Sequence, residues 1–408
     1  MGSSGDVHPF VGLGLALKAR GHDVTLITGA YFEPLVRGVG LDCVVLGSVE
    51  DFEAATADRK LWHARKGLHV VARLILPFLP RLYELIAERY VPGRTVVVAP
   101  GLAFGARIAN EKLGVPLATV HLQPFCFRSV YDMPVLPMLA LPSWCPRRLK
   151  RLLYWVGDLD ADRAVAADTN AFRATLGLPP VKRLFGDWWH SPRLVVGLFP
   201  DWFGPPQPDW PAQTTLTGFP LYDESDAHDV SPQVHSYLDG GEPPIVFTPG
   251  SAMRHGRPFF EAAVEACRTM GRRGILLSRY AEHVPQRLPD GVRHFDYVPL
   301  SRLLPRAAAL VHHGGIGTLA QGLAAGVPQL LMPMAFDQPD NAARLTRLGA
   351  GTSLRPRAFR GPAVAEALQS MIDSKPMSQR CRELGAKVRA GATLERACAA
   401  VERLVQRV

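Results

Sequence analysis

The sequence predicts an α/β protein with two Rossmann-like domains, each built on a parallel sheet. Three observations lead to this fold class. Strand-like and helix-like stretches alternate in both halves of the chain, as they do where helices cover both faces of a parallel sheet. Residues 203–244 hold eight prolines and few long apolar runs, so they separate the halves. The chain of 408 residues is also too long for one ordinary core and suits two domains of about 150–200 residues.

The N-terminal half carries the first set of alternating elements. A helix is expected from Pro9 to Arg20, because apolar residues recur at helical spacing and Gly21 is a C-cap signal. Strands are expected at 23–28, 41–46, 95–99 and 116–121, and a further helix at 104–113. In such a domain a glycine-rich turn like residues 2–5 normally follows a first, central strand. We therefore expect the first N-terminal strand to be missing from this chain, with apolar codons in frame upstream of Met1.

The C-terminal half repeats the alternation. Strands are expected at 244–248, 274–278, 292–297, 307–312 and 329–333, and helices at 258–270 and 318–325. The expected boundaries are an N-terminal domain at 1–205, a linker at 206–243, a C-terminal domain at 244–385 and a C-terminal helix at 386–408. Two parallel sheets of this kind face each other across a cleft, and ligands bind there at the carboxyl ends of the strands.

Charge and composition narrow the class of partner. Lysines and arginines number 46 against 37 aspartates and glutamates, a formal net charge of +9, with the densest basic cluster at residues 147–151. A diffuse positive field suits an anionic substrate or an anionic membrane surface. No basic stripe with interleaved aromatic residues is present, so nucleic acid is not expected as a partner.

Cysteine spacing and hydropathy indicate the compartment. The six cysteines stand far apart and form no Cys-x-x-Cys pair, which is typical of reduced core residues in a cytosolic protein. The histidines form no pair at metal-binding spacing, so no metal site is expected. No run of about 18 uncharged apolar residues and no signal peptide is present. We expect a soluble, cytoplasmic protein that can contact the inner face of a membrane peripherally.

A glycine-rich turn lies between a strand and a helix at residues 312–318, His-His-Gly-Gly-Ile-Gly-Thr. Gly314, Gly315 and Gly317 let the backbone approach a ligand closely. A helix that begins at Thr318 would present unpaired N–H groups and a partial positive charge to a diphosphate. His313 and the Thr318 hydroxyl can add donors. A bare Gly-Gly-x-Gly fits an ordinary tight turn equally well, and the paired histidines favour the anion site.

Two further segments follow strands at the same edge of the sheet. Asp337 and Gln338 come after the strand at 329–333 and can accept and donate hydrogen bonds to sugar hydroxyls. The alternative is an Asp/Pro turn with a helix cap. Ser251 comes after the first strand of this half and offers a hydroxyl beside the diphosphate, although by itself it fits an ordinary loop.

Residues 312–318, Pro328 and Asp337-Gln338 resemble the donor-binding motif of a large family of nucleotide-sugar glycosyltransferases, which includes plant UDP-sugar transferases and antibiotic glycosyltransferases. The resemblance implies the GT-B fold and inversion of the anomeric centre without a metal or other cofactor. It implies a dTDP- or UDP-linked sugar as co-substrate.

The same resemblance implies roles for individual residues. The diphosphate is assigned to His313 and Thr318, the sugar to Asp337 and Gln338, and the nucleobase to backbone groups at Tyr297 and Val298. In plant members an acid holds the ribose, and that position is Gln321 here. The choice between UDP and dTDP therefore stays open.

Segments in the middle of the chain resemble the rhamnosyltransferase of rhamnolipid synthesis. They include residues 180–183, 189–192, 198–200 and 217–220. This likeness implies a deoxysugar such as L-rhamnose, and a hydroxy-acyl lipid acceptor bound by the N-terminal domain. Whether a partner subunit delivers that acceptor stays open. The alternatives are a transferase for a sterol, polyketide or other apolar small molecule, a nucleotide-sugar epimerase, and a non-catalytic nucleotide-sugar-binding subunit.

An inverting transfer needs a base that takes the proton of the acceptor hydroxyl. The turn at the start of the chain offers Asp6 and His8. The family resemblance favours Asp6, which occupies the position of the catalytic acid or histidine, and His8 is the second choice because its usual pKa is nearer neutrality. Asp6 is equally suited to capping the helix that follows.

Asp158 and Asp160 form an Asp-x-Asp pair, which binds a metal and a nucleotide sugar in a different glycosyltransferase fold. Here the pair lies inside a long helical pattern at 152–176 with no preceding strand. A solvated helix face is therefore the favoured interpretation.

Overall fold

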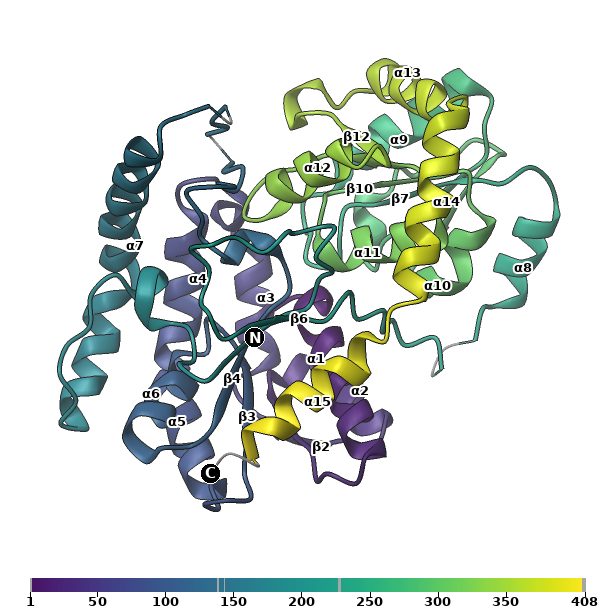
Figure 1. Ribbon diagram of the computed structural model, residues 1–408. Coiled ribbons are helices and arrows are strands. Elements are labelled where there is room, and N and C mark those ends of the chain that lie inside the picture. The colour runs from purple at the N-terminus through teal and green to yellow at the C-terminus, as the bar shows by residue number, and fades with distance from the viewer. Residues whose placement is uncertain (1, 138, 143, 227–228, 406–408) are drawn as a thin grey trace. The chain divides into compact units, whose positions relative to one another are not determined.

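The computed structural model describes residues 2–137, 139–142, 144–226 and 229–405 (Figure 1). The protein divides into two compact units. The first unit consists of Leu13–Gly218 together with the residues from Ala392 onward, and the second consists of Gly2–Gly12 and Phe219–Gly391. The division therefore falls inside the segment expected as a linker, and residues 2–12 are part of the unit formed by the C-terminal half.

The first unit holds two parallel sheets. One has the order β3-β4-β5-β6, and the other pairs β1 with β2. The strand bounds are β1 Thr25–Thr28, β2 Asp42–Val45, β3 Val97–Pro100, β4 Leu117–His121, β5 Leu194–Gly197 and β6 Thr214–Leu216. Every residue of β4 and β5 is buried, which is typical of strands covered on both faces.

The helices of the first unit pack on the sheets or on one another. Their bounds are α2 Glu33–Gly38, α3 Val49–Ala57, α4 Gly67–Ile75, α5 Leu79–Arg89, α6 Phe104–Leu113, α7 Arg147–Thr175 and α15 Thr393–Val405. Phe104 and Ile108 of α6 share a buried cluster with Val165 of α7 and Leu184. Within the described residues, no helix is both long and apolar enough to cross a bilayer.

The last helix, α15, belongs to the first unit. Arg193 donates from Nη2 to the Leu404 carbonyl at 3.0 Å, and Arg20 forms a two-point pair with Glu402 at 2.7 Å for each contact. The expected single helix at 386–408 was wrong: it contains the end of α14 (Lys375–Arg389), which lies in the second unit, and then all of α15.

The second unit is built on one six-stranded parallel sheet with the order β12-β11-β10-β7-β8-β9. The strands are β7 Ile245–Thr248, β8 Gly274–Leu277, β9 Val292–Phe295, β10 Ala309–His312, β11 Gln329–Leu331 and β12 Gly351–Ser353. The helices are α8 Pro232–Asp239, α9 Arg257–Met270, α10 Leu300–Leu303, α11 Ile316–Ala325, α12 Gln338–Arg347, α13 Gly361–Ile372 and α14.

Alternation along β7 explains why both faces of this sheet are covered. Ile245 and Phe247 pack in a cluster with α9 and α13, whereas Val246 packs in a second cluster with α8 and α10. All three side chains are fully buried. The parallel sheet between two helical layers, predicted from the sequence, is confirmed for this unit.

The first helix begins earlier than predicted. α1 runs over Ser4–Ala19, with Pro9 inside it, whereas the sequence pattern placed its start at Pro9. The Asp6 carboxylate accepts hydrogen bonds from the Ser3 N–H at 2.7 Å and from the Ser3 hydroxyl at 2.9 Å. This contact closes the first turn, so Asp6 is the third helical residue and not the cap itself.

Asp158 is a buried partner of two arginines and not part of a solvated face. It is 2% exposed, pairs with Arg128, and lies 3.2 Å from Arg183 Nε. Only Asp160 of the Asp-x-Asp pair is exposed. The expectation of a solvated helix face was therefore wrong for Asp158, since α7 turns that residue toward the body of the unit.

Asp158→Ala is expected to lower the free energy of unfolding by about 2–4 kcal/mol, because it leaves the Arg128 guanidinium half-buried without its partner. Asp160→Ala is the matched control and is expected to change it by less than about 0.5 kcal/mol. Urea unfolding of both variants measures the difference, and equal stabilities would contradict the role given to Asp158.

Candidate functional site

The order of strands in the second unit fixes where a ligand can bind. From β7 the chain moves outward through β8 and β9, then returns to place β10 on the other side of β7. In open parallel sheets, a ligand crevice forms outside the carboxyl ends of the two strands at such a switch point. Residues 249–251 follow β7 there, and residues 313–315 follow β10.

The loop after β10 requires glycine. Gly314 has φ +93°, and a Cβ atom on it would lie 3.3 Å from the Gln338 carbonyl oxygen. A Cβ on Gly315 would collide with the His313 ring. Gly250 in the neighbouring loop has φ +98°. Both loops therefore keep a conformation in which the backbone itself lines the carboxyl edge of the sheet.

The loop leads into the N-terminus of α11, which begins at Ile316, two residues before the predicted start at Thr318. The Leu319 N–H bonds to the Gly315 carbonyl at 3.0 Å, so the N–H groups of Ile316, Gly317 and Thr318 have no helical acceptor. The residue before the helix, Gly315, has no side chain that could cap them. These three donors and the positive end of the helix form a site suited to an anion.

The two histidines of the loop have different functions. His312 is fully buried, accepts from the Gly314 N–H at Nδ1 over 3.1 Å, and contacts Gln329 Oε1 through Nε2 at 3.0 Å. Nε2 must then carry the hydrogen, because Nδ1 is the acceptor. Burial lowers the pKa of His312 to about 3. His312 therefore shapes the loop as a neutral ring.

His313 faces the loop after β7. A Cβ on Gly250 would come 2.6 Å from His313 Cε1, so the ring fills the space left by that glycine. Its Nδ1 atom is buried, and no hydrogen-bond partner for it occurs among the described residues. Burial lowers the pKa of His313 to about 4. His313 thus offers one N–H donor to a ligand at neutral pH, without a positive charge.

Asn341, which the sequence interpretation did not assign to the site, joins Asp337 to the glycine-rich loop after β10. Asn341 Nδ2 donates to the Gly314 carbonyl at 2.9 Å and to Asp337 Oδ2 at 2.6 Å. Asn341 is fully buried one helical turn after Asp337. The i,i+4 spacing of an acid and an amide at a helix start was the available signal for this contact.

Asp337 is only partly ionised near neutral pH. Burial raises its pKa to about 7, and the negative charge of Asp6 acts in the same direction. The neighbouring Gln338 uses its side-chain oxygen to accept from the Met334 N–H at 2.8 Å and the Ala335 N–H at 3.2 Å. Only the Gln338 amide N–H groups therefore remain for a sugar hydroxyl.

The start of α1 adjoins the start of α11. Gly5 Cα lies 3.9 Å from the position a Cβ would take on Gly317, and the Ser4 N–H donates to Ser251 Oγ at 3.3 Å. Asp6, in the first turn of α1, is exposed. These contacts place the residues just before Asp6 beside Ser251 and the α11 N-terminus, whereas the sequence interpretation had put Asp6 in the N-terminal domain.

His8 is directed to a different neighbour. Its Nε2 atom lies 2.7 Å from Glu224 Oε1, and its ring meets the Tyr222 ring edge-on at 5.6 Å. Glu224 is buried and has φ +60°, an uncommon backbone conformation for a non-glycine residue. The two candidate bases therefore have different surroundings, and only Asp6 acts electrostatically on Asp337.

The residues expected near the nucleoside make contacts with other residues of the protein. Tyr297 donates its hydroxyl to the Asp223 carbonyl at 2.6 Å, and the Val298 side chain is buried in the core. Gln321 is also buried and donates to the Leu221 carbonyl at 3.0 Å. The amide of Gln321, the residue expected at the ribose, is therefore used within the protein, where it holds residue 221.

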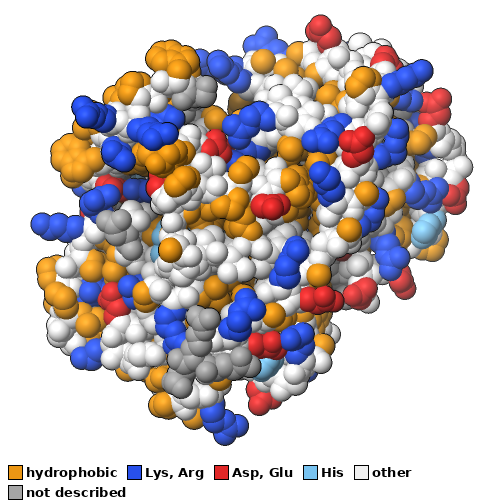
Figure 2. All heavy atoms as spheres, viewed as in Figure 1, with side chains coloured by type: hydrophobic (Ala, Val, Ile, Leu, Met, Phe, Trp, Pro, Cys, Tyr) orange, Lys and Arg blue, Asp and Glu red, His pale blue; other side chains and the backbone are white. Residues whose placement is uncertain are grey.

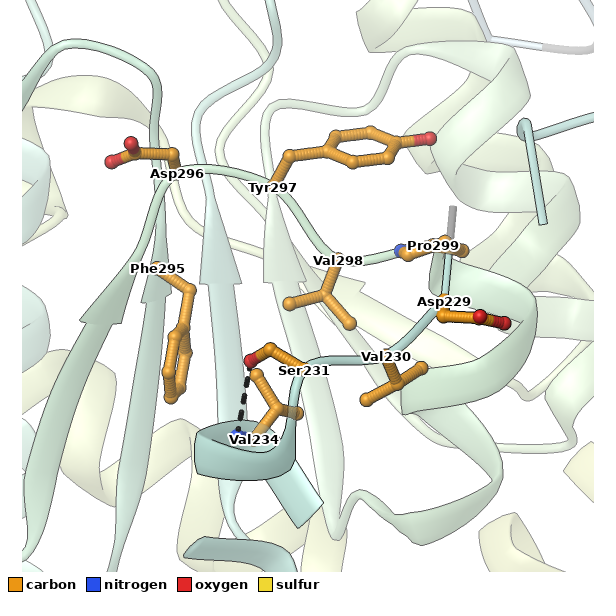
Figure 3. Close-up of a pocket in the computed structure, with 9 residues that line it drawn as sticks. All are labelled: Asp229, Val230, Ser231, Val234, Phe295, Asp296, Tyr297, Val298 and Pro299. Carbon is orange, nitrogen blue, oxygen red and sulfur yellow. Dashed lines mark hydrogen bonds between the residues drawn. The ribbon is translucent and has the colours of Figure 1, made fainter. Parts of the chain in front are cut away.

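A pocket of about 320 Å³ lies under the loop that carries Tyr297 and Val298 (Figure 3). Phe295, Val298 and Val234 point toward its interior, whereas Tyr297 points away from it. The full lining is Asp229, Val230, Ser231, Val234, Phe295, Asp296, Tyr297, Val298 and Pro299. The base of this pocket is apolar, whereas the start of α11 presents polar N–H groups.

Known proteins match the sequence over nearly its whole length. Residues 1–132 match the glycosyltransferase family 28 N-terminal domain, and residues 275–401 match the erythromycin biosynthesis protein CIII-like C-terminal domain. The sequence is 33% identical to O-mycaminosyltylonolide 6-deoxyallosyltransferase of Streptomyces fradiae, over 98% of this chain and 95% of the relative.

Solved structures share the fold. The glycotransferase of kitacinnamycin superposes with a TM-score of 0.76 at 24% identity, over 99% of this chain and 97% of that chain. The spinosyn rhamnosyltransferase SpnG, complexed with thymidine diphosphate, superposes with a TM-score of 0.65 at 18% identity, over 98% and 96% of the two chains.

A doubly covered parallel sheet with an open helix N-terminus at its switch point is the expected frame for binding a nucleotide diphosphate. The relative from Streptomyces fradiae and the two matched domain families show the class of protein to which this chain belongs. This protein belongs to the GT-B nucleotide-sugar glycosyltransferases of the family 1 type, and it is a glycosyltransferase. The predicted family is confirmed, and the roles given to residues 312–318 and 337–338 stay predictions.

Asp337→Asn is expected to stabilise the protein at pH 8 and to leave its stability unchanged below about pH 4. The folded pKa of about 7 lies above the ordinary value of 3.8, so the folded state binds more protons between these values. Stability of the parent protein therefore falls as pH rises through this window. Asparagine cannot ionise, and the expected difference at pH 8 is about 1–3 kcal/mol.

Thermal or urea unfolding across this pH range measures the effect. Asp296→Asn is the control, because that side chain is 78% exposed. A pH dependence that Asp337→Asn leaves unaltered would contradict the protonation assigned to Asp337.

Proposed function

We propose that this glycosyltransferase moves a hexose, such as the deoxysugar L-rhamnose, from a dTDP-sugar to a hydroxyl group of an apolar acceptor. The anomeric centre is inverted, and no metal takes part. The observation that carries the proposal is the set of three N–H groups at the start of α11 that have no helical acceptor.

The start of α11 is suited to the leaving group. The N–H groups of Ile316, Gly317 and Thr318 and the helix dipole stabilise the negative charge that grows on the diphosphate as the sugar–phosphate bond breaks. His313 adds the N–H of an uncharged ring, and Ser251 adds a hydroxyl group. Charge stabilisation by this group of donors replaces the role of a divalent cation.

Asp6 is the proposed base. As the acceptor oxygen attacks the anomeric carbon, the bond from that carbon to the diphosphate oxygen breaks, and the acceptor proton passes to Asp6. One oxygen of Asp6 is held by Ser3 at 2.7 Å and 2.9 Å, which fixes the direction of the carboxylate. His8 is paired with Glu224 and is not proposed as the base.

The sugar and the nucleotide contact different groups. Asp337 can accept or donate a hydrogen bond to a sugar hydroxyl, because its pKa of about 7 lets both protonation states occur near neutral pH. The Gln338 amide adds N–H donors. The complex of SpnG with thymidine diphosphate supports dTDP as the nucleotide.

Two observations bear on the acceptor. The likeness of the middle segments to the rhamnosyltransferase of rhamnolipid synthesis favours a hydroxy-acyl lipid. The relative from Streptomyces fradiae, named for O-mycaminosyltylonolide, favours a polyketide acceptor. Both are apolar molecules with free hydroxyl groups, and the assay separates them.

The test is to incubate the purified protein with dTDP-rhamnose, other dTDP-sugars and UDP-sugars, with and without each acceptor. Release of nucleotide diphosphate that depends on an acceptor, together with a glycoside of inverted configuration, is the expected result. Chelation of divalent cations is expected to leave the rate unchanged. Retained configuration, or a rate that follows added Mg²⁺, would contradict the mechanism.

Asp6→Asn is expected to lower kcat by about 100- to 10,000-fold, because the acceptor proton loses its base. The dissociation constant for dTDP should change by no more than about twofold, since Asp6 does not contact the diphosphate in this mechanism. Steady-state kinetics and calorimetric titration measure the two quantities. His8→Gln is the comparison, and a larger loss of kcat there than in Asp6→Asn would exclude Asp6 as the base.

Asn341→Ala is expected to weaken dTDP binding by about tenfold, because it removes the hydrogen bonds that the Asn341 amide donates to the Gly314 carbonyl and to Asp337. Calorimetric titration with dTDP measures this change. Gln379→Ala removes an exposed amide of the same unit and is expected to have no effect. Equal affinities of both variants would show that Asn341 does not position the loop.

A further inference from the structure

The exposed side of α7 carries a continuous apolar stripe. Leu152, Trp155, Val156 and Leu159 recur at i, i+3, i+4 and i+7 of the helix, and 42–52% of each residue is exposed. Leu149, at 44%, extends the stripe toward the start of the helix, and Trp144, at 81%, is exposed three residues before the helix begins. We call these six residues the α7 stripe.

The stripe is not needed for packing of the first unit. α7 is fixed by its other side, where Ala161, Val165 and Thr169 are buried and Asp158 pairs with Arg128. Single exposed apolar residues are ordinary on protein surfaces, but five on one side of a helix, preceded by an exposed tryptophan, indicate an interaction surface.

Positive charge surrounds the stripe. Arg147, Arg148, Arg151 and Arg163 of α7 are exposed, and the exposed acids of the same helix are Asp160 and, further along, Asp168. Arg147 also lies over the Tyr131 ring at 4.1 Å, which holds the start of the helix. Figure 2 shows hydrophobic side chains beside lysine and arginine over the N-terminal half of α7, at the upper left of the view.

We propose that the α7 stripe binds the surface of a bilayer that contains anionic lipid, with the helix lying in the plane of the interface. Apolar residues on one side of a helix enter the boundary between headgroups and acyl chains, and arginines at its edges contact anionic headgroups. Tryptophan favours this boundary because it combines a large apolar ring with one N–H donor.

Charge argues against a second copy of the protein as the occupant. A symmetric dimer through this surface would place the same patch on both sides of the contact. The four arginines of one copy would then face those of the other, and like charges in a contact are repulsive. Anionic headgroups are complementary to the same arginines.

The inference does not depend on the proposed glycosyl transfer. Its test uses no sugar donor, so failure of one leaves the other standing. The experiment is co-sedimentation of the full chain with vesicles of phosphatidylcholine, alone or with about one third phosphatidylglycerol. Binding is expected to the anionic vesicles, and to weaken as salt is raised.

Three variants locate the binding surface. Leu152→Ser with Trp155→Ser is expected to weaken partition by at least about tenfold. Arg148→Ala with Arg151→Ala is expected to weaken it by about fivefold for each arginine. Val91→Ser with Arg94→Ala removes an exposed valine and an exposed arginine elsewhere in the first unit, and is expected to have no effect.

Circular dichroism melting checks that each variant is folded. Because the changed side chains are exposed, the melting temperatures are expected to match that of the parent. No sedimentation with any vesicle, or equal partition of all three variants, would overturn the proposal. A dimer in sedimentation velocity that Trp155→Ser abolishes would also overturn it in favour of a second copy.

Discussion

The N–H groups at the start of α11 are the constraint on which the second unit depends. They are unpaired because Gly315 cannot cap them, and glycine is required there because any side chain would collide with His313. His312 and Asn341 hold the loop from either side, through Gly314. The fold therefore leaves three N–H groups without a helical acceptor at the switch point of the sheet, an arrangement suited to an anion.

Around that site, burial decides the charge of each polar group. Burial lowers the pKa of His312 and of His313, so both rings are neutral at pH 7, and burial raises the pKa of Asp337. At neutral pH the site presents oriented N–H groups and uncharged histidine rings. Asp6 remains exposed on α1.

Much of this frame could be predicted from the sequence. Apolar runs such as 244–248 and 307–312 are continuous and flanked by glycine or proline, so their strands were predicted to within two residues. Short strands such as β12 gave no pattern to detect. The start of α1 was misplaced because glycine and serine are weak helix formers, and the contact between Ser3 and Asp6 that closes its first turn is not a periodic signal. Contacts between distant segments, such as His8 with Glu224 and Gln321 with residue 221, depend on tertiary packing, which a single sequence does not encode locally.

The central claim is that a nucleotide diphosphate binds to the N–H groups at the start of α11. Nuclear magnetic resonance of the ¹⁵N-labelled protein during titration with dTDP tests it most directly. The account predicts that the amide protons of Ile316, Gly317 and Thr318 move downfield at saturation, as they gain phosphate acceptors. Saturation by dTDP with these three signals unmoved, and shifts confined to other segments, would contradict it.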